Sequence, residues 1–378
     1  MKLEAWFLKF FKTSLVSLNF KQSNKLRKKK YHIIGVMSGT SLDGIDLAEI
    51  VFKYAEEKWN FQFLAAETIP YTSFWKDELR EAIHYSEEKL ERLDFKYTEK
   101  LSEEISKFIK KHNILEIDAV CSHGHTVLHQ PEKGFTYQIG NLPRISKLLG
   151  QTVVCDFRVQ DVELGGQGAP LVPIGDQLLF PEYDYCLNLG GFANCSFEKD
   201  GQRIAFDICP VNIVLNKYAE KLGFDFDESG KLAASGEVDQ NLLQKLNTLS
   251  FYAQKPPKSL GLEWVKECIF PLLDASKISS EDILRTFTEH IAVQLANHFS
   301  EKASVLITGG GAYNSFLIDR LKNLASVEVV IPSTEILEYK EALIFGLLGV
   351  LKLRNEVNCL ASVTGAKKDH SSGKIFNP

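Results

Sequence analysis

Three consecutive stretches near the start of the chain have the hydrophobic patterns of strands. The first begins at residue 31 and contains the apolar run 33–38. In the second, apolar and polar residues alternate, as at Leu47, Glu49, Val51 and Lys53, and the third, 59–69, alternates in the same way. A period of two is typical of strands with one buried face. The glycine-containing turn between the first two stretches predicts a hairpin, so the three stretches predict an antiparallel meander.

The same plan occurs a second time. After helices predicted at 76–84 and 88–111, short strands at 119–121, 135–139 and 152–155 alternate with a helix at 143–149. A new strand, glycine turn and strand follow at 185–197, then a strand at 204–207, helices at 261–273, 280–302, 314–324 and 341–353, and strands at 305–308 and 327–331. The two glycine turns lie about 150 residues apart, a spacing that suits two similar domains. The predicted fold class is therefore α/β, with domains at 31–185 and 186–378, a cleft between them, and a C-terminal segment that packs back on the first domain.

Composition narrows the class of protein. The chain has 378 residues, of which 44% are hydrophobic and 25% charged, which is ordinary for a two-domain globular protein. Residues 1–30 carry nine Lys and Arg against Glu4 alone and are expected to form a disordered basic extension. The remainder is acidic, so no nucleic acid partner is expected, and no stretch predicts a membrane span. Seven dispersed cysteines without paired spacing indicate reduced packing residues and a cytoplasmic location.

The first glycine turn has the chemistry of a phosphate site. It consists of Gly39, Thr40, Ser41, Leu42, Asp43, Gly44, Ile45 and Asp46. Glycines permit a close approach of the backbone, and successive amides can surround an anion. Asp43 and Asp46 could hold Mg²⁺ through water. The segment lacks the Walker and dinucleotide patterns, and a plain hairpin is the alternative interpretation.

Several motifs in this order resemble the anhydro-N-acetylmuramic acid kinase family, within the actin, Hsp70 and sugar kinase superfamily. They are GTSLDGID (39–46), SHGHTVLH (122–129), QIGN (138–141), DFR (156–158) with Asp161, GGQGAPLVP (165–173), LNLGGFAN (187–194), TGGGAYN (308–314) and SVTGA (362–366). The resemblance implies two actin-like, ribonuclease H-like domains, ATP and Mg²⁺ as cofactors, and a tendency to form homodimers. It also implies hydrolysis of the 1,6-anhydro bond of the sugar together with phosphorylation of O6, giving N-acetylmuramate 6-phosphate in peptidoglycan recycling.

The resemblance assigns roles to individual residues. Asp207 is expected to be the base that activates water, although an Asp before Pro210 could instead cap a helix. The 39–46 turn, Gly190 and Gly191 are expected at the phosphates, and Gly309, Gly310, Gly311 and Asn314 at the adenosine. The substrate-binding residues are expected to be His123, Arg158, Asp161, Gln167 and Glu341.

Alternatives remain for several of these residues. Arg158 and Asp161 could simply pair with each other, and Glu341 could stabilise the start of a helix. His123, His125 and His129 could suggest zinc, but no other ligand accompanies them at the usual spacing. A different sugar kinase, or an ATP-gated module without enzymatic activity, would share the superfamily plan.

Two motifs depart from the family pattern. The segment Asp207-Ile208-Cys209-Pro210-Val211-Asn212 lacks both glycines and the Thr of the usual Asp-Thr-Gly-Pro-Gly-Asn, and His125 replaces a Gln. Asp207 itself is retained, so the departures put the backbone donors around it in doubt.

Overall fold

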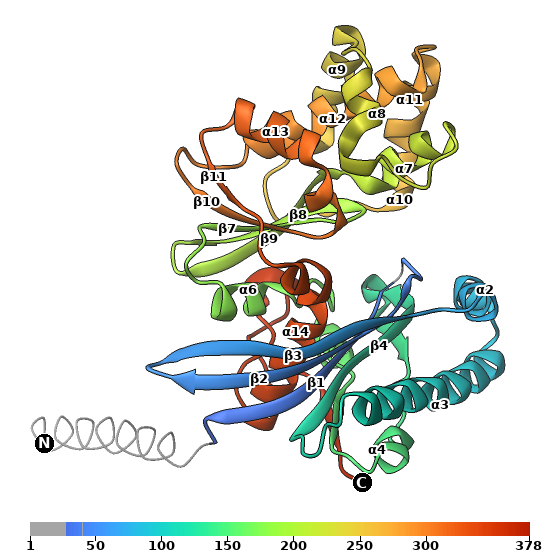
Figure 1. Ribbon diagram of the computed structural model, residues 1–378, viewed down its shortest axis with the longest axis vertical. Helices are drawn as coiled ribbons and strands as arrows, with labels where there is room; N and C mark the ends of the chain where they lie inside the picture. The colour runs from blue at the N-terminus through green and yellow to red at the C-terminus, as the bar shows by residue number, and fades with distance from the viewer. Residues whose placement is uncertain (1–27, 40) are drawn as a thin grey trace, which may run out of the picture.

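Two β-sheets organise the computed structural model, which describes residues 28–39 and 41–378 (Figure 1). The seven strands of the first sheet are β1 (Lys30–Ser38), β2 (Gly44–Ala55), β3 (Lys58–Pro70), β4 (Ala119–Gln130), β5 (Phe135–Ile139), β6 (Val153–Cys155) and β12 (Lys374–Phe376). The five strands of the second are β7 (Tyr185–Leu189), β8 (Phe192–Lys199), β9 (Gln202–Pro210), β10 (Ser304–Thr308) and β11 (Glu328–Val330). We call the parts of the chain around them the first unit and the second unit.

The two sheets share one strand order. The first runs β12-β6-β4-β1-β2-β3, and the second runs β11-β10-β7-β8-β9. In each, a meander of three antiparallel strands continues into parallel strands beside its first member: β4 and β6 in the first sheet, β10 and β11 in the second. The predicted meander and its repetition are therefore confirmed, as is the two-domain α/β fold class.

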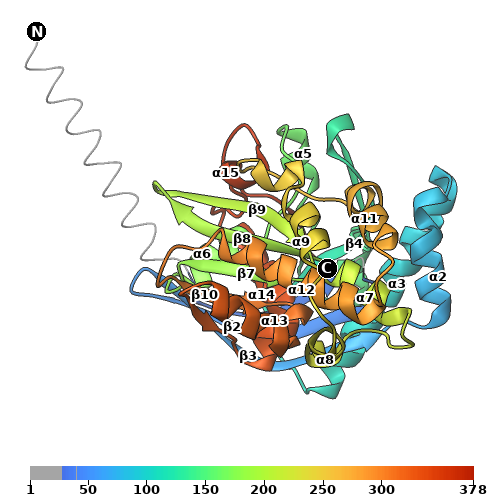
Figure 2. The same cartoon turned by 90° about the horizontal axis from the view of Figure 1, so that it is seen from above.

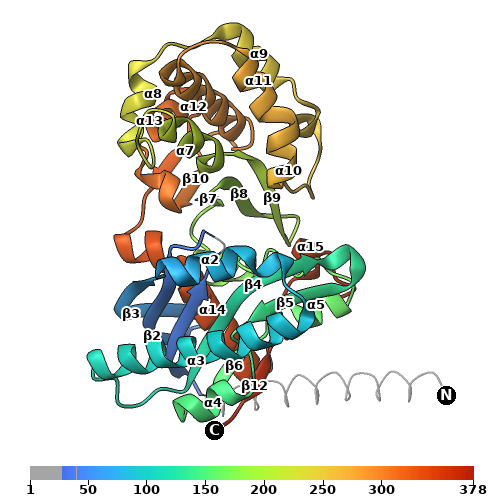
Figure 3. The ribbon, with the colours of Figure 1, turned by 90° about the vertical axis from the view of Figure 1, so that its right-hand side faces the viewer.

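Helices cover both faces of the first sheet. Period-two alternation sends Ile34 and Leu47 into a core with one helical layer, while Ile33 and Ile50 enter a separate core on the opposite face. Figure 3 shows α3 crossing the near face and α14 behind the sheet. The helices of this unit are α2 (Ser73–Glu81), η1 (Ala82–His84), α3 (Glu87–Lys111), η2 (Pro131–Lys133), α4 (Arg144–Leu149), α5 (Val159–Glu163), α6 (Pro173–Leu179), α14 (Thr334–Leu353) and α15 (Ala361–Thr364).

The second sheet has its own helical layer. Leu187, Leu189 and Ile307 pack with α7, α12 and α13 in one core, and Figure 2 shows these helices from above. Cys186 and Leu306 face the other way and join the core around α14. The helices are α7 (Asn212–Glu220), η3 (Glu228–Gly230), α8 (Lys231–Ser235), α9 (Gln240–Asn247), η4 (Ser250–Ala253), α10 (Leu262–Trp264), η5 (Val265–Ile269), α11 (Phe270–Ala275), α12 (Ser280–Ala296), η6 (Gly310–Tyr313) and α13 (Ser315–Leu324).

A buried charged cluster joins the two units. Lys340 of α14 lies 2.7 Å from a carboxylate oxygen of Asp176 in α6. Ser196 of β8 donates to Asp176 at 2.5 Å, and Arg203 of β9 donates to Ser196 at 2.7 Å. We call Asp176, Ser196, Arg203 and Lys340 the junction cluster. Because both cations are buried, they need this single carboxylate nearby.

Helix α14 approaches the first sheet very closely. A Cβ added at Gly35 of β1 would lie 2.1 Å from the carbonyl oxygen of Ala342, and one at Gly349 would lie 2.1 Å from Cys121 Sγ. The absence of side chains at these two positions lets helix and strand backbones meet. This close packing fixes where the side chains of α14 point.

Among the boundaries that differ from the sequence predictions, three concern predicted site residues or the N-terminal extension. Strand β4 continues through His123 and His125 to Gln130, so these histidines lie within a strand instead of after its end. Helix α14 begins at Thr334, with a non-helical residue at Tyr339, so Glu341 does not open the helix. Lys30 already belongs to β1, and the amide of Tyr54 donates to Lys29 O at 2.8 Å; only residues 1–27 of the predicted extension lie outside the described residues.

The prediction that the cysteines are packing residues is confirmed for six of them. All seven cysteines are free, and six are buried, Cys268 being half-buried. In the part of the chain that the structure describes, none of the helices combines the length and apolar character needed to span a membrane.

Candidate active site

A polar cleft of about 320 Å³ opens beside the first glycine turn. Its lining comes from β1, the turn, β4, the start of α5 and α14: Met37, Ser38, Gly39, Ser41, His123, Thr126, Arg158 and Glu341. The parallel pairing of β1 with β4 places the turn next to His123. The cleft thus brings together five of the predicted site residues. Gly39 and Ser41 belong to the predicted phosphate turn, and His123, Arg158 and Glu341 were predicted to bind the sugar.

Arg158 and His123 hold each other in place within this cleft. Arg158 Nε donates to His123 Nε2 at 2.7 Å, and its Nη1 donates to the carbonyl of Gly168 at 2.6 Å. His123 Nδ1 lies 2.9 Å from the carbonyl of Gly124, so the neutral ring carries its proton on Nδ1. Burial, reinforced by the positive charge of Arg158, lowers the pKa of His123 well below its usual value. The ring therefore stays neutral and accepts from Arg158.

Carboxylates gather near Asp46. Burial raises the pKa of Glu341, while Arg158 and Lys340 lower it in part. Burial also raises the pKa of Asp46 to about 6, against a hydrogen bond from Thr68, and the charges of Glu341 and Asp43 add to the rise. Glu341 and Asp43 therefore both repel the Asp46 carboxylate, an arrangement that a bound cation would relieve.

The two glycines of the first turn differ in their surroundings. A Cβ at Gly39 would meet only Ser41 Oγ at 3.6 Å, so the turn is open on this side. A Cβ at Gly44 would lie 2.4 Å from the carbonyl oxygen of Ile69. Gly44 is thus explained by its packing on β3, and phosphate approach is not needed to account for it. Thr40 lies outside the described residues.

A buried network of side-chain hydrogen bonds begins at Ser38, next to the first glycine turn. Ser38 Oγ lies 2.7 Å from Tyr71 Oη and 2.9 Å from His125 Nδ1, and Tyr71 Oη lies 2.6 Å from Tyr97 Oη. Burial lowers the pKa of His125 to about 4, so its ring is neutral. Sequence reasoning missed Tyr71 and Tyr97, because neither belongs to any of the motifs that marked the site. His129 is bound separately to Thr136 at 2.9 Å, so the three histidines do not converge on a metal.

A second group of glycines lies where β7 and β10 end. The amides of Asn212 and Val211 donate to the carbonyls of Gly190 and Gly191, at 3.3 and 2.8 Å. A Cβ at Gly191 or Gly310 would meet only single atoms at 3.9 Å, whereas Gly309 and Gly311 pack tightly on Asn188 and Leu189. The segment that departs from the family motif therefore buttresses this turn through its backbone.

Asp207 lies in β9, outside the lining of the cleft. Its carboxylate accepts from the amide of Leu260 at 2.8 Å, and its own amide donates to Lys258 O. Burial raises the pKa of Asp207, and the hydrogen bond from Leu260 offsets part of the rise. Helix α7 begins only at Asn212, so the alternative role of Asp207 as a helix cap is wrong.

Three other predicted site residues lie outside the lining of this cleft. Asp161 is fully buried and accepts from Gly168 N and Thr364 Oγ1, both at 2.7 Å, so it holds the glycine-rich loop and makes no ion pair with Arg158. Gln167 is exposed, and its backbone N–H donates to Thr364 O at 2.8 Å. Asn314 Oδ1 caps α13 through the amide of Leu317 at 2.9 Å.

The fold and the cleft together define a two-unit α/β protein, with glycine turns at equivalent strand ends and a polar cleft beside one of them. The sequence profile described as anhydro-N-acetylmuramic acid kinase matches residues 31–378. The chain belongs to this family.

Relatives from distant bacteria support the assignment. The anhydro-N-acetylmuramic acid kinase of Pseudomonas savastanoi pv. phaseolicola is 34% identical over 369 residues, covering 92% of this chain and 99% of that protein. Those of Haemophilus influenzae and Bacillus cereus are 32% and 31% identical, with 93% and 92% of this chain covered and 99% of each relative. Among solved structures, a ROK family glucokinase from Streptomyces griseus in complex with glucose and AMPPNP aligns with a TM-score of 0.39 at 12% identity, covering 84% of this chain and 99% of that one.

Proposed function

We propose that this kinase transfers the γ-phosphoryl group of ATP to O6 of 1,6-anhydro-N-acetylmuramic acid while water opens the anhydro ring at C1. The products would be N-acetylmuramate 6-phosphate and ADP, formed in the cytoplasm during peptidoglycan recycling. The observation that carries this proposal is the convergence of Gly39, His123, Arg158 and Glu341 on one cleft in a chain of this family. A homodimer remains a prediction from the family resemblance.

The cleft offers complementary contacts for such a sugar. Arg158 uses Nε and Nη1 within the protein, and Nη2 is the remaining guanidinium nitrogen that could bind the lactyl carboxylate. Glu341 lies in the same cleft and could accept from a sugar hydroxyl. A carboxylate and a hydroxyl of the substrate would thus meet groups of matching chemistry.

The remaining chemistry needs a base and a phosphate cradle. Asp207 would take a proton from the attacking water, and a pKa raised by burial suits a base working near neutral pH. Since Asp207 lies on the second unit and the cleft on the first, the two units would have to close on substrate before reaction. Asp43 and Asp46 would hold Mg²⁺ through water, and the ion would neutralise phosphate charge.

A mass-resolved assay tests the reaction. The full chain is incubated with the anhydrosugar, ATP and Mg²⁺, and the sugar is expected to gain one water and one phosphoryl group. Gain of a phosphoryl group alone would indicate a plain sugar kinase. 1,6-Anhydro-N-acetylglucosamine, which lacks the lactyl carboxylate, serves as the matched control and is expected to react much more slowly. Equal rates would remove the role proposed for Arg158.

Gly39→Val tests the first turn. The fold has room for a side chain at this position, so the protein should remain folded while the added methyl groups keep phosphate from the backbone. We expect ATP affinity, measured by calorimetry, to fall by about tenfold or more, the effect of losing roughly 1.4 kcal/mol of binding. Sugar binding should persist. Leu115→Val, at an exposed residue outside the cleft lining, is the control; unchanged ATP affinity in Gly39→Val would make this turn a hairpin only.

The pH dependence of Mg²⁺ binding tests Asp46. Its pKa of about 6 means that about one tenth of the carboxylate is ionised at pH 5 but about nine tenths at pH 7. Protonation removes the charge that attracts the cation, so Mg²⁺ affinity in the presence of a non-hydrolysable ATP analogue should fall about tenfold between pH 7 and pH 5 beyond the loss due to the nucleotide. Asp46→Asn should remove this extra dependence. The same slope in both proteins would exclude Asp46 from the Mg²⁺ site.

A further inference from the structure

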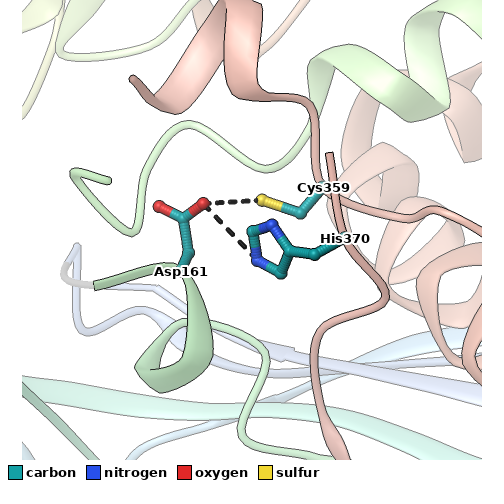
Figure 4. Close-up of side chains that lie close together, drawn as sticks. All are labelled: Asp161, Cys359 and His370. Carbon is teal, nitrogen blue, oxygen red and sulfur yellow. Dashed lines mark hydrogen bonds and ion pairs between the residues drawn. The ribbon is translucent and has the colours of Figure 1, made fainter. Parts of the chain in front are cut away.

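A second group of metal-binding side chains lies apart from the cleft lining. Asp161 of α5 meets Cys359 and His370 of the C-terminal segment, and one potential ligand atom from each lies within 4.8 Å of the other two (Figure 4). Cys359 Sγ is 3.0 Å and His370 Nε2 is 3.6 Å from the same oxygen, Asp161 Oδ1. All three side chains are buried. The predicted function uses neither Cys359 nor His370.

The hydrogen bonds of His370 leave one ring nitrogen without a partner. Nδ1 lies 3.1 Å from the carbonyl of Lys368, which fixes the proton on Nδ1 in the neutral ring. Nε2 has no hydrogen-bond partner in the described structure. The side chain is only 3% exposed, so bulk water does not supply one either. Its lone pair then faces a carboxylate oxygen, which is unfavourable unless a positive species lies between them. A donor bond from Nδ1 to a backbone carbonyl is also the usual support of a metal-bound histidine.

We propose that Asp161, Cys359 and His370 bind one Zn²⁺. Zinc accepts thiolate, imidazole and carboxylate ligands at about 2.0–2.3 Å, which sets the ligand atoms of a tetrahedral site roughly 3.3–3.8 Å apart. The two distances to Asp161 Oδ1 lie close to that range, and the ligand atoms of Cys359 and His370 lie within 4.8 Å of each other, so side-chain movements of about 1 Å would bring all three atoms onto one ion. Binding forms the zinc–sulfur bond and breaks the Cys359 S–H bond, and the proton passes to solvent. A water molecule would complete the fourth position.

The bound ion would have a structural role. The C-terminal segment already holds the glycine-rich loop: Gln167 N donates to Thr364 O at 2.8 Å, and Lys367 N donates to Leu164 O at 3.1 Å. Zinc would add a second tie between α5, which starts beside Arg158, and residues 359–370. This loop carries Gly168, whose carbonyl receives Arg158, so the ion would stabilise the support of the cleft without entering it.

Cobalt provides a direct spectroscopic test on the full, metal-stripped and reduced chain. Co²⁺ is expected to bind with one equivalent per chain, to show a sulfur-to-cobalt charge-transfer band, and to be displaced by Zn²⁺. Cys359→Ser should abolish the band, and His370→Gln should lower Zn²⁺ affinity by more than the ~10–100-fold typical of losing an outer-shell partner. Cys268→Ser, at a half-buried cysteine of the second unit, is the matched control and should keep both signals.

Thermal unfolding with and without Zn²⁺ completes the test. Zn²⁺ should raise the unfolding temperature of the unmodified chain and of Cys268→Ser, but not of His370→Gln. The absence of a thiolate band in the unmodified chain would overturn the proposal, leaving the contacts of Asp161 with Cys359 and His370 as packing contacts within the protein. A band that survives in Cys359→Ser and His370→Gln alike would also overturn it.

Discussion

Asp207→Asn is expected to lower turnover by about 10²- to 10⁴-fold, the range typical of losing a general base. The amide cannot accept the proton that the attacking water must lose. Because the variant keeps the shape of the side chain, its oxygen can still accept from Leu260 N, so the strand should remain in place. Steady-state measurement of ADP release, with calorimetric titration of ATP, separates the two effects.

ATP affinity should be nearly unchanged in Asp207→Asn, so the loss should fall on kcat. Glu341→Gln is a useful comparison, since that carboxylate lines the cleft and is expected to affect mainly KM for the sugar. Turnover of Asp207→Asn within a few-fold of the unmodified enzyme would reject Asp207 as the base. A larger loss in kcat for Glu341→Gln than for Asp207→Asn would transfer that role to Glu341.

Asp176→Ala is expected to lower the free energy of unfolding by about 3–5 kcal/mol, the usual cost of removing one partner from a buried ion pair. Lys340 and Arg203 would then be buried without a carboxylate. Burial lowers the pKa of Lys340, but Asp176 more than offsets this and leaves it raised. Chemical denaturation at neutral pH, where the lysine is charged, measures the loss.

A second substitution identifies the cause. Asp176→Ala combined with Lys340→Met should recover part of the stability, because the methionine removes one uncompensated charge while filling similar space. If the single variant lost less than about 1 kcal/mol, the ion pair would have no more weight than one on the surface. If Lys340→Met instead lowered the free energy of unfolding further, on top of the loss from Asp176→Ala, packing and not charge would explain the effect.

The sequence predicted those features that depend on local pattern. Hydrophobic patterning identified the meanders. The glycine turns between the first two strands of each meander placed Gly39 and Gly190 at strand ends. Strand β4 was predicted too short, because Gly124 and the neighbouring histidines resemble a loop, whereas pairing with β1 and β5 extends the strand. Neighbouring strands thus overrode the local signal.

Roles that depend on distant partners could not be predicted. Asp161 was expected at the substrate, but Thr364, Cys359 and His370, about 200 residues further along the chain, surround it. Likewise, Glu341 was placed at the start of a helix, because the less regular turn before Tyr339 gave no clear periodicity. The family resemblance had already placed Glu341 at the substrate, and it lines the cleft. Only the three-dimensional packing of α14 reveals that its neighbour Lys340 enters the junction cluster.

The first unit is built from two segments that are far apart in the sequence, and this affects how the protein folds during synthesis on the ribosome. The strands β1 to β6 emerge early, but α14, which covers one face of their sheet, and β12, which extends it, are made last. The second unit, from β7 to β11, is contiguous and can be completed while the earlier segment still exposes apolar residues such as Ile33 and Ile50. The half of the protein that is translated first therefore finishes folding last, and until termination it presents a surface that chaperones would have to shield.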